Sequence, residues 1–336
     1  MARARVTLLD VAARAGVSRS TASFVLTGRS DDLRISADAQ ERVLRAALEL
    51  NYRPNLAARG LRTKTTHTIG LISDRIATEQ FAGEFIRGIV AAALKHDHLL
   101  VIGETEGDPE VGVRLIDGML DRLVDGLIYG CMFTRQVRLP ATSRQYPLVL
   151  LNCLAARWQA PAVIPDEYEA GRTAARALID AGHHQGIYLV GERPRQLFAA
   201  RERSKGIRTV LSEEGLRLAG TVDCRWSPGA AFVAVRAMLA GRRRPSAFIC
   251  LNDRIALGAY QALHDAGLAI PGDVSVVSFD DSDLASWLRP QLTSVALPHH
   301  EMGYRAAELL VNRELEPVRH RVPMPLRARP SLAPPS

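Results

Sequence analysis

The stretch Thr7 to Leu26, TLLDVAARAGVSRSTASFVL, is typical of two short helices joined by a turn. Thr7 can cap the first helix and Ser18 the second, because a hydroxyl oxygen at either position can accept a hydrogen bond from a backbone amide of the first turn. Gly16 supplies a permissive backbone between the two helices. Small and β-branched residues in the stretch allow the helices to cross closely. The pattern predicts a helix-turn-helix, a motif whose second helix enters the major groove of DNA.

The second predicted helix leaves Arg19, Ser20, Ser23 and Phe24 on its outer face. An ordinary helix pair with a solvated face would show the same pattern, so the charge of the surrounding segment matters. Residues 1–66 contain 12 Lys and Arg against 6 Asp and Glu, whereas the whole chain contains 43 against 36. Nearly all of the net positive charge therefore lies on this segment, as binding to DNA phosphates requires.

Length and composition are those of an ordinary globular protein, with 336 residues of which 47% are apolar and 24% are charged. No apolar run approaches the roughly 20 residues that span a bilayer, and the N-terminus lacks the apolar region of a signal peptide. The cysteines form no CxxC pair, which favours reduced thiols; they are Cys131, Cys153, Cys224 and Cys250. The histidine pairs at 183–184 and 299–300 have no carboxylate or cysteine at ligand spacing. We therefore expect a cytoplasmic protein without membrane partner, cofactor or metal.

A third helix is predicted after Ser36, which can cap it. Its apolar residues at helical spacing are Val43, Leu44, Ala47, Leu48 and Leu50. Pro54 ends this helix, and a short basic piece follows at residues 56–63. Because a lone helix of this length is marginal in water, we expect it to order only against a partner copy and DNA.

From residue 67 onward, apolar strands alternate with helices. Strands of this kind, separated by helices, predict a parallel sheet that is covered on both faces. Two such rounds occur in series, so we expect two lobes that close on a ligand.

Several blocks of the chain resemble LacI-type transcriptional regulators, the lactose- and purine-repressor family. In the first part of the chain they are TLLDVA at 7–12, AGVS at 15–18 and LNYRPN at 50–55, with a hinge that continues through Leu61. Later blocks include NDRIALG at 252–258, IPGDV at 270–274 and SFDD at 278–281. The resemblance implies an α/β protein: an all-α helix-turn-helix headpiece, then a two-lobed, periplasmic-binding-protein-like effector domain with parallel sheets.

The domain boundaries follow from the patterns and the resemblance together. Residues 1–53 are the predicted DNA-binding domain, and residues 54–66 are the hinge helix and linker. Residues 67–330 form the effector-binding and dimerisation domain. Its lobes are expected to comprise residues 67–165 plus 294–322 and residues 166–292 plus 323–330. Residues 331–336 are expected to be a disordered tail.

The resemblance also implies roles in DNA binding. Arg19, Ser20 and Phe24 are expected to face base edges, and Leu61 to insert into the minor groove at the operator centre. Ser18, Thr21 and Thr27 are expected near phosphates. The full predicted DNA-binding set is Thr7, Ser18, Arg19, Ser20, Thr21, Ser23, Phe24, Thr27, Asn55, Ala58 and Leu61.

Two departures from the family pattern affect DNA recognition. Phe24 stands where the family commonly has a small polar or basic residue, so a guanine contact is replaced by an apolar surface suited to a thymine methyl group. The loop from Gly28 to Ile35 is longer than in the lactose-type pattern. Gly60 also weakens the hinge helix by roughly 0.5–1 kcal/mol relative to alanine.

In the effector domain, the resemblance implies that Arg203 binds the ligand and that Phe81 places an aromatic ring near it. Asn252 and Asp280 each follow a predicted strand, at the end where open α/β sheets bind ligands. Trp226 can stack on a sugar ring. These side chains favour a carbohydrate effector. The alternative is that Asn252 and Asp280 only cap the following helices and that Trp226 only packs.

A DNA-binding repressor that responds to a small molecule accounts for both regions of the chain. A transport-type sugar-binding receptor without a DNA role would share the two-lobed fold, but it would not carry residues 1–66. An enzyme would need a nucleophile with a base, or paired carboxylates; Asp280 and Asp281 have no partner histidine nearby in the sequence, so no enzymatic activity is expected. A palindromic operator in double-stranded DNA needs two recognition helices, which predicts a homodimer. The operator, the effector and the direction of its effect are left open.

Overall fold

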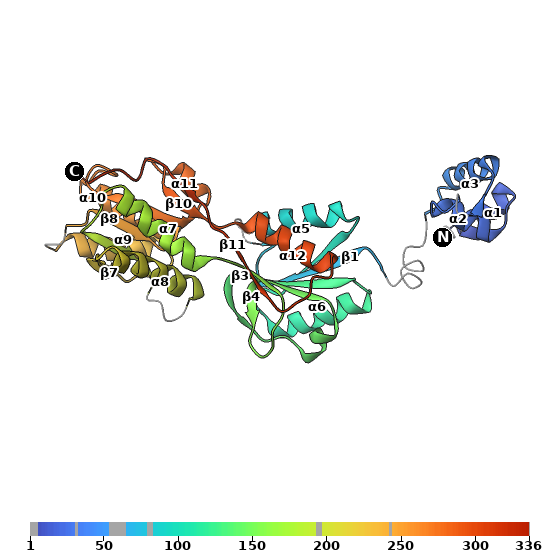
Figure 1. Ribbon diagram of the computed structural model, residues 1–336, viewed down its shortest axis with the longest axis horizontal. Coiled ribbons are helices and arrows are strands. Elements are labelled where there is room, and N and C mark those ends of the chain that lie inside the picture. Colours follow the sequence, from blue (N-terminus) through green and yellow to red (C-terminus); the bar gives the residue numbers. More distant parts are fainter. Residues whose placement is uncertain are drawn as a thin grey trace. The chain divides into compact units, whose positions relative to one another are not determined.

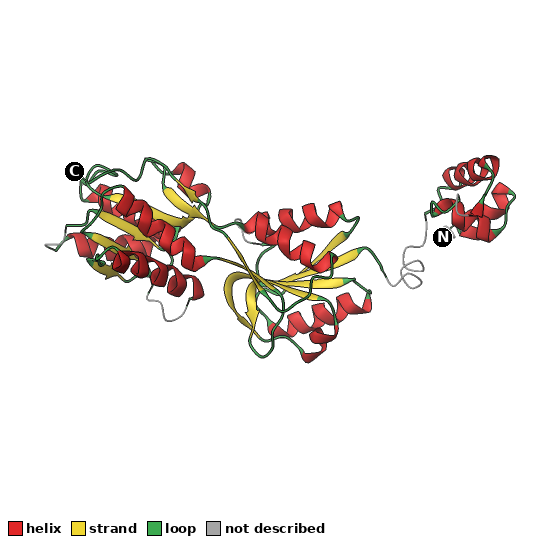
Figure 2. Cartoon of the chain, viewed as in Figure 1, coloured by secondary structure: helices red, strands yellow, loops and turns green. Residues whose placement is uncertain are grey.

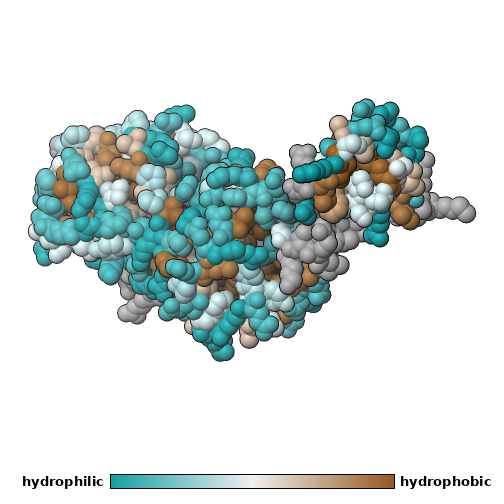
Figure 3. All heavy atoms as spheres, turned by 45° about the vertical axis from the view of Figure 1, so that its right-hand side comes forward, coloured by the Kyte–Doolittle hydropathy of each residue, from teal (hydrophilic) through white to brown (hydrophobic). Residues whose placement is uncertain are grey.

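The computed structural model describes residues 6–30, 33–53, 65–78, 83–192, 197–241 and 244–335. It divides into two compact units, Met1–Thr66 and His67–Ser336 (Figure 1). On the face shown in Figure 3, the second unit is largely hydrophilic, with hydrophobic side chains in small groups, whereas the first unit shows hydrophilic and hydrophobic side chains side by side. None of the helices in the described part of the chain is long and apolar enough to cross a membrane.

The first unit, which we call the headpiece, contains three helices: α1 (Leu8–Ala15), α2 (Arg19–Leu26) and α3 (Ala37–Glu49). Both predicted caps of the helix-turn-helix are confirmed. The Thr7 hydroxyl accepts a hydrogen bond from the Asp10 amide at 3.3 Å, and the Asp10 carboxylate accepts one from the Thr7 amide at 2.8 Å. Ser18 accepts from the Thr21 amide at 3.0 Å. Gly16 ends α1 with a φ of 65°, a conformation that glycine adopts without strain.

The headpiece core is small and is formed by all three helices. Its buried residues are Val11, Ala12, Ala15, Ala22, Val25, Val43 and Ala46. One expectation was wrong. Leu44 and Leu48 were assigned to the apolar face of α3, but they are 50% and 82% exposed, because the buried face runs through Val43 and Ala46.

The first lobe of the second unit, which we call the effector unit, is built on a sheet with the strand order β11-β5-β4-β3-β1-β2. All of its described strand pairs are parallel. The strands are β1 (Thr68–Ser73), β2 (Leu99–Glu104), β3 (Gly126–Val137), β4 (Leu148–Ala155), β5 (Ala162–Pro165) and β11 (Arg319–Val322). The helices are α5 (Gly83–Lys95), α6 (Pro109–Asp121), the short 3-10 helix η2 (Ala141–Gln145) and α12 (His299–Val311).

The second lobe has a sheet in the order β12-β10-β9-β8-β6-β7, parallel except for the pair of β10 with β12. The strands are β6 (Ile187–Val190), β7 (Gly220–Val222), β8 (Ala247–Cys250), β9 (Ser275–Asp280), β10 (Thr293–Ala296) and β12 (Leu326–Arg327). The helices are α7 (Glu167–Asp180), α8 (Phe198–Glu213), α9 (Pro228–Leu239), α10 (Asp253–Asp265) and α11 (Asp283–Trp287).

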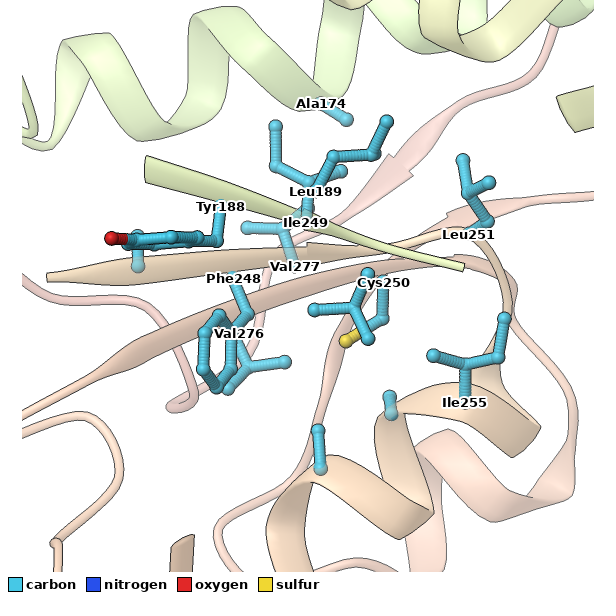
Figure 4. Packing of buried hydrophobic residues seen from close by; sticks show 14 of the residues in the cluster. Ala174, Tyr188, Leu189, Phe248, Ile249, Cys250, Leu251, Ile255, Val276 and Val277 are labelled. Atoms are coloured by element: carbon cyan, nitrogen blue, oxygen red, sulfur yellow. The ribbon is translucent and has the colours of Figure 1, made fainter. Parts of the chain in front are cut away.

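Helices cover both faces of each sheet, as the apolar strands predict (Figure 2). In the first lobe, α5 and α12 pack on one face and α6 on the other. In the second lobe, Figure 4 shows Ala174 of α7 on one side of the strands and Ile255 of α10 on the other. Strand residues such as Phe248 and Ile249 are fully buried between these helices.

The chain passes between the lobes three times, after β5, after β10 and after β11. The second passage comes slightly later than expected, because β10 pairs with β9 in the second lobe before the chain leaves it. The strand β2 also departs from expectation. It is an edge strand and is not covered on both faces, since Leu99 is 65% and Val101 41% exposed.

The expected disordered tail is ordered as far as residue 335. Ser331 is fully buried, and its hydroxyl donates to the carbonyl of Val276 at 2.6 Å. The carbonyl of Ala333 accepts from Ser275 at 3.0 Å and lies 2.9 Å from Nε2 of His183. These hydrogen bonds to the beginning of β9 and to His183 fix the tail, despite its proline-rich composition.

Candidate functional site

The outer face of α2 carries four of the eleven predicted DNA-binding residues. Arg19 and Ser20 are exposed, and Ser23 and Phe24 are half-buried. Phe24 lies outside the headpiece core, and the guanidinium of Arg29 is 5.7 Å from the centre of its ring. The helix therefore presents one charged, two hydroxyl and one aromatic side chain toward a partner.

Four further predicted residues surround this face. Thr7 and Ser18 are exposed caps, and Thr21 lies beside Ser18, with the two hydroxyl oxygens 2.8 Å apart. The hydroxyl of Thr27 donates to the carbonyl of Ser23 at 2.8 Å. Thr7 and Ser18 mark the N-termini of α1 and α2. The remaining free amides and the helix dipole make such a terminus a favourable place for a phosphate group.

Some predicted residues are outside the part of the chain that the structure describes. In the hinge these are Asn55, Ala58 and Leu61, and in the effector unit Phe81. Their roles stay predictions from the family resemblance.

A cleft of about 890 Å³ lies between the two lobes of the effector unit. This volume is in the range of small-molecule sites. Both lobes contribute to its lining, and four of the predicted effector residues meet there: Arg203, Trp226, Asn252 and Asp280. Asn252 and Asp280 stand at the carboxyl ends of β8 and β9, which meet at the same edge of the parallel sheet.

Arg203 is the central cation of the cleft and is 1% exposed. Its Nε donates to Oε2 of Glu167 at 2.5 Å, and its Nη2 donates to Oε1 of the same carboxylate at 3.1 Å. Its Nη1 donates to the carbonyl of Leu251 at 2.6 Å and to Oδ1 of Asp280 at 3.2 Å. The guanidinium also lies 4.6 Å from the centre of the Phe279 ring, a cation–π distance.

Two glycines explain why Glu167 and Arg203 meet. A Cβ atom on Gly171 of α7 would lie 2.2 Å from the carbonyl oxygen of Arg203, and one on Gly206 of α8 would lie 2.0 Å from that of Tyr168. The backbones of α7 and α8 therefore touch, which only glycine permits. This contact places Glu167, in the first turn of α7, opposite Arg203, in the second turn of α8.

The acidic side of the cleft contains Asp280 and Asp253. Asp280 has a φ of 101°, a rare conformation for a residue with a side chain. Burial raises the pKa of Asp280, and Glu167 adds to this effect, while Arg203 opposes it. Asp253 is 1% exposed and accepts hydrogen bonds from the amide and hydroxyl of Ser282 and from the hydroxyl of Ser294. Burial, and then the charge of Asp280, raise the pKa of Asp253 to about 7.

Asn252 and Trp226 line the cleft and also make the structural contacts that the alternative expected. The side-chain oxygen of Asn252 accepts from the Ile255 amide at 2.8 Å and so caps α10, as the alternative expected. Its amide nitrogen has no partner within the described residues and remains available to a ligand in the cleft. Trp226 packs on the second-lobe core, and its ring centre lies 5.9 Å from the guanidinium of Arg203. Its indole nitrogen is buried without a described partner.

The wall from the first lobe is formed by an irregularity in β3. The register of β3 against β4 shifts between Gly130 and Arg135, as in a β-bulge, and Met132, Phe133 and Thr134 of this segment line the cleft. Asn152, with a φ of 54°, holds the bulge by donating to the carbonyls of Cys131 and Met132, each at 3.0 Å. The ring of Phe133 is 58% exposed and forms an apolar surface at the cleft.

Sequence reasoning missed three residues of this site: Glu167, Asp253 and Phe133. Glu167 and Asp253 are charged residues in the first turn of helices that directly follow buried strands, and this position could have identified them. Phe133 depends on the bulge, which no local pattern revealed. Within the described residues, no group of three or more His, Cys, Asp or Glu side chains is arranged to hold a metal ion.

A capped helix-turn-helix followed by a two-lobed unit with a polar cleft defines a class, the DNA-binding regulators that respond to a ligand. Comparison with known proteins identifies the same class. The family model described as bacterial regulatory proteins, lacI family, matches residues 7–55, and that of the periplasmic binding protein-like domain matches residues 175–332. The ribose operon repressor of Escherichia coli is 33% identical over 317 residues, which cover 93% of this chain and 94% of the relative. The chain belongs to the LacI family, which confirms the resemblance and the fold expected from it.

Solved structures support the same assignment. The lac repressor dimer bound to operator and the anti-inducer ONPF is 26% identical, with a TM-score of 0.79, over 98% of this chain and 99% of that one. A LacI family transcriptional regulator from Enterococcus faecium with bound ribose is 25% identical, with a TM-score of 0.63, over 80% of this chain and 100% of that one.

Proposed function

We propose that the protein is a homodimeric transcriptional repressor that binds a palindromic operator through α2 and is controlled by a carbohydrate bound between the lobes. The observation that carries this proposal is the combination, in one chain, of the exposed face of α2 with the cleft around Arg203 and Asp280. Each half alone would fit other proteins, but only a ligand-responsive regulator needs both.

The carbohydrate assignment rests on the chemistry of the cleft. Asp280 offers carboxylate oxygens to hydroxyl donors, and Asn252 and Arg203 offer N–H groups to hydroxyl acceptors. Trp226 and Phe133, one from each lobe, offer apolar surface to a sugar ring. The ribose bound to the Enterococcus faecium regulator is consistent with this class of ligand.

The homodimer is supported by the edge strand β2. Its residues Leu99 (65%), Val101 (41%) and Ile102 (41%) are exposed to solvent. Leu94 of the neighbouring α5 is 62% exposed. An exposed apolar edge strand is a liability in a monomer, which a second copy would remove by covering it. The related lac repressor structure on operator is a dimer.

The remaining features of the proposal follow from this role. Repression of transcription takes place where the chromosome is, which in bacteria is the cytoplasm, and it needs no catalysis. A transport-type receptor would have no use for the capped helices of the headpiece. Binding of the effector is expected to change operator affinity because the ligand would contact both lobes and would bind their two arrangements differently.

The test is a selection of operators from randomised duplex DNA with the full chain. We expect enrichment of a palindrome with two half-sites. A variant that lacks residues 1–66 should bind none of the selected DNA at physiological salt, because the net positive charge lies on the removed segment. Operator binding by the truncated chain would overturn the assignment of the DNA-binding face.

A further inference from the structure

Glu167, Leu251 and Asp280 together occupy most of the hydrogen-bonding capacity of Arg203. A guanidinium group has five N–H donors. Two of those in Arg203 are donated to Glu167, one to the carbonyl of Leu251 and one to Asp280. One N–H on Nη2 has no partner among the described residues, and it is the N–H left for a ligand.

This occupancy changes what the arginine can recognise. Arginine binds phosphate and carboxylate groups tightly when two parallel N–H groups of its planar fork face the anion. In this chain the fork formed by Nε and Nη2 already holds the carboxylate of Glu167, and both partners are almost completely buried. A second anion would have to displace Glu167 and leave its charge buried without a partner, which is costly.

The charges around Arg203 also disfavour the binding of an anion. Asp280 and Asp253 lie at the same end of the second lobe, so three buried or half-buried carboxylates line the cleft together with the one buried guanidinium of Arg203. Burial raises the pKa of both aspartates; the charge of Asp280 adds to this effect at Asp253, and the charge of Glu167 adds to it at Asp280. An anionic ligand would add to the repulsion among these charges.

The other arginines that line the cleft do not offset the negative charge of these carboxylates. Arg87 is paired with Glu84 at 2.8 Å, and Arg327 lies 3.8 Å from Asp281. Arg254 is exposed, and its charge lowers the pKa of Asp280 only as the last of five contributions.

We propose that Glu167 sets the charge specificity of the cleft, so that the effector is a polyhydroxylated compound without a phosphate or carboxylate group. Hydroxyl groups donate to Asp280, and the free N–H of Arg203 and the amide of Asn252 donate to hydroxyl oxygens. Phosphorylated sugars and sugar acids are rejected. This inference rests on the proposed carbohydrate effector and restricts its class.

The first experiment compares matched ligands by calorimetry on the full chain. The probes are D-ribose with D-ribose 5-phosphate, and D-glucose with D-glucose 6-phosphate and D-glucuronate. For any pair that binds, the charged member should bind at least roughly tenfold more weakly, because the fork of Arg203 is occupied and the buried carboxylates of the cleft repel an added negative charge. A phosphate ester or uronate that binds more tightly than its neutral parent overturns the inference but leaves the proposed carbohydrate effector standing. If a screen of a wider collection of sugars found none that binds, this result would instead contradict the proposed function.

The second experiment needs no sugar and uses inorganic phosphate as the probe at constant ionic strength. The wild type should show no saturable binding, whereas Glu167→Gln should bind phosphate, because the glutamine oxygen can hold only one N–H of the fork and no buried negative charge then opposes the anion. Glu84→Gln is the matched control: it removes the same charge from an exposed ion pair at the cleft and should behave as the wild type. Saturable binding by the wild type, or no gain in a folded Glu167→Gln protein, overturns the inference.

A second variant keeps the test decisive if Glu167→Gln does not fold. Asp280→Asn removes one negative charge beside Arg203, while Glu167 continues to hold the fork. It should raise the affinity for phosphate, although by less than the loss of Glu167 would. An affinity equal to that of the wild type contradicts the proposal.

Discussion

Asp253 should make the stability of the effector unit fall as the pH rises toward neutrality. Its side chain is 1% exposed, and its pKa is raised from 3.8 to about 7 in the folded protein. Between these values the unfolded chain releases the proton while the folded chain keeps it. The folded state therefore binds more protons in this window, and the free energy of unfolding decreases with pH by about 1.4 kcal/mol per unit.

The total effect follows from the size of the shift. A change of about 3 units corresponds to at most roughly 4 kcal/mol, lost between about pH 4 and pH 7 and constant above that. Asp253→Asn should remove this loss. An asparagine oxygen can still accept from Ser282, and its amide can donate to the hydroxyl of Ser294. The variant should therefore be more stable than the wild type at pH 8 and closer to it at pH 5.

The assay is urea unfolding from pH 5 to pH 9, followed by tryptophan fluorescence. Trp158, Trp226 and Trp287 are the tryptophans of the chain and belong to the effector unit, so the signal does not report the headpiece. The pKa of His183 is lowered mainly by burial, which gives a stability change of the opposite sign at acidic pH. The difference between wild type and Asp253→Asn cancels that contribution.

The exposed Asp283 supplies the control, because Asp283→Asn should leave the pH profile unchanged. The reasoning is refuted if wild type and Asp253→Asn lose stability in parallel between pH 5 and pH 8. It is also refuted if Asp253→Asn is the less stable protein at pH 8 while it remains folded and monodisperse.

Three further substitutions test other parts of the structure. Ser18→Ala should lower the melting temperature of the headpiece in circular dichroism, because it removes a cap worth about 1 kcal/mol; an unchanged transition would show that the cap is not needed. Arg203→Ala should destabilise the effector unit by about 3–5 kcal/mol in urea, because Glu167 would be left buried without its partner; a loss below 1 kcal/mol would contradict the buried ion pair. Phe24→Arg should shift one position of each selected half-site toward guanine, since arginine can contact O6 and N7 together. An identical sequence preference would mean that Phe24 does not face the bases.

The headpiece was the part of the fold most open to prediction from sequence. The caps at Thr7 and Ser18 and the turn at Gly16 depend on residues within four positions of one another, so local chemistry determines them. The core face of α3 was assigned less well. Leu44 and Leu48 share the helical period with buried positions, and only the packing of α1 and α2 decides which side of α3 is covered.

The cleft was predictable at strand ends and much less so elsewhere. Asn252 and Asp280 were found because parallel strands carry ligand residues at their carboxyl ends. The pairing of Glu167 with Arg203 joins residues 36 positions apart through the contact of two helices, which no local pattern encodes. The same holds for the tail, where Ser331 is fixed by a bond to Val276.

The central claim is that ligand binding in the cleft controls operator binding by the headpiece. The most direct measurement is the operator affinity of the full chain, by fluorescence anisotropy on the selected operator, with and without the sugar found by calorimetry. For the wild type, saturating sugar should change the dissociation constant at least roughly fivefold, as a coupling energy of 1 kcal/mol or more requires. Asp280→Asn should bind the operator as the wild type does without sugar and should lose the response at the same sugar concentration. A wild-type operator affinity that is independent of the bound sugar would contradict the claim.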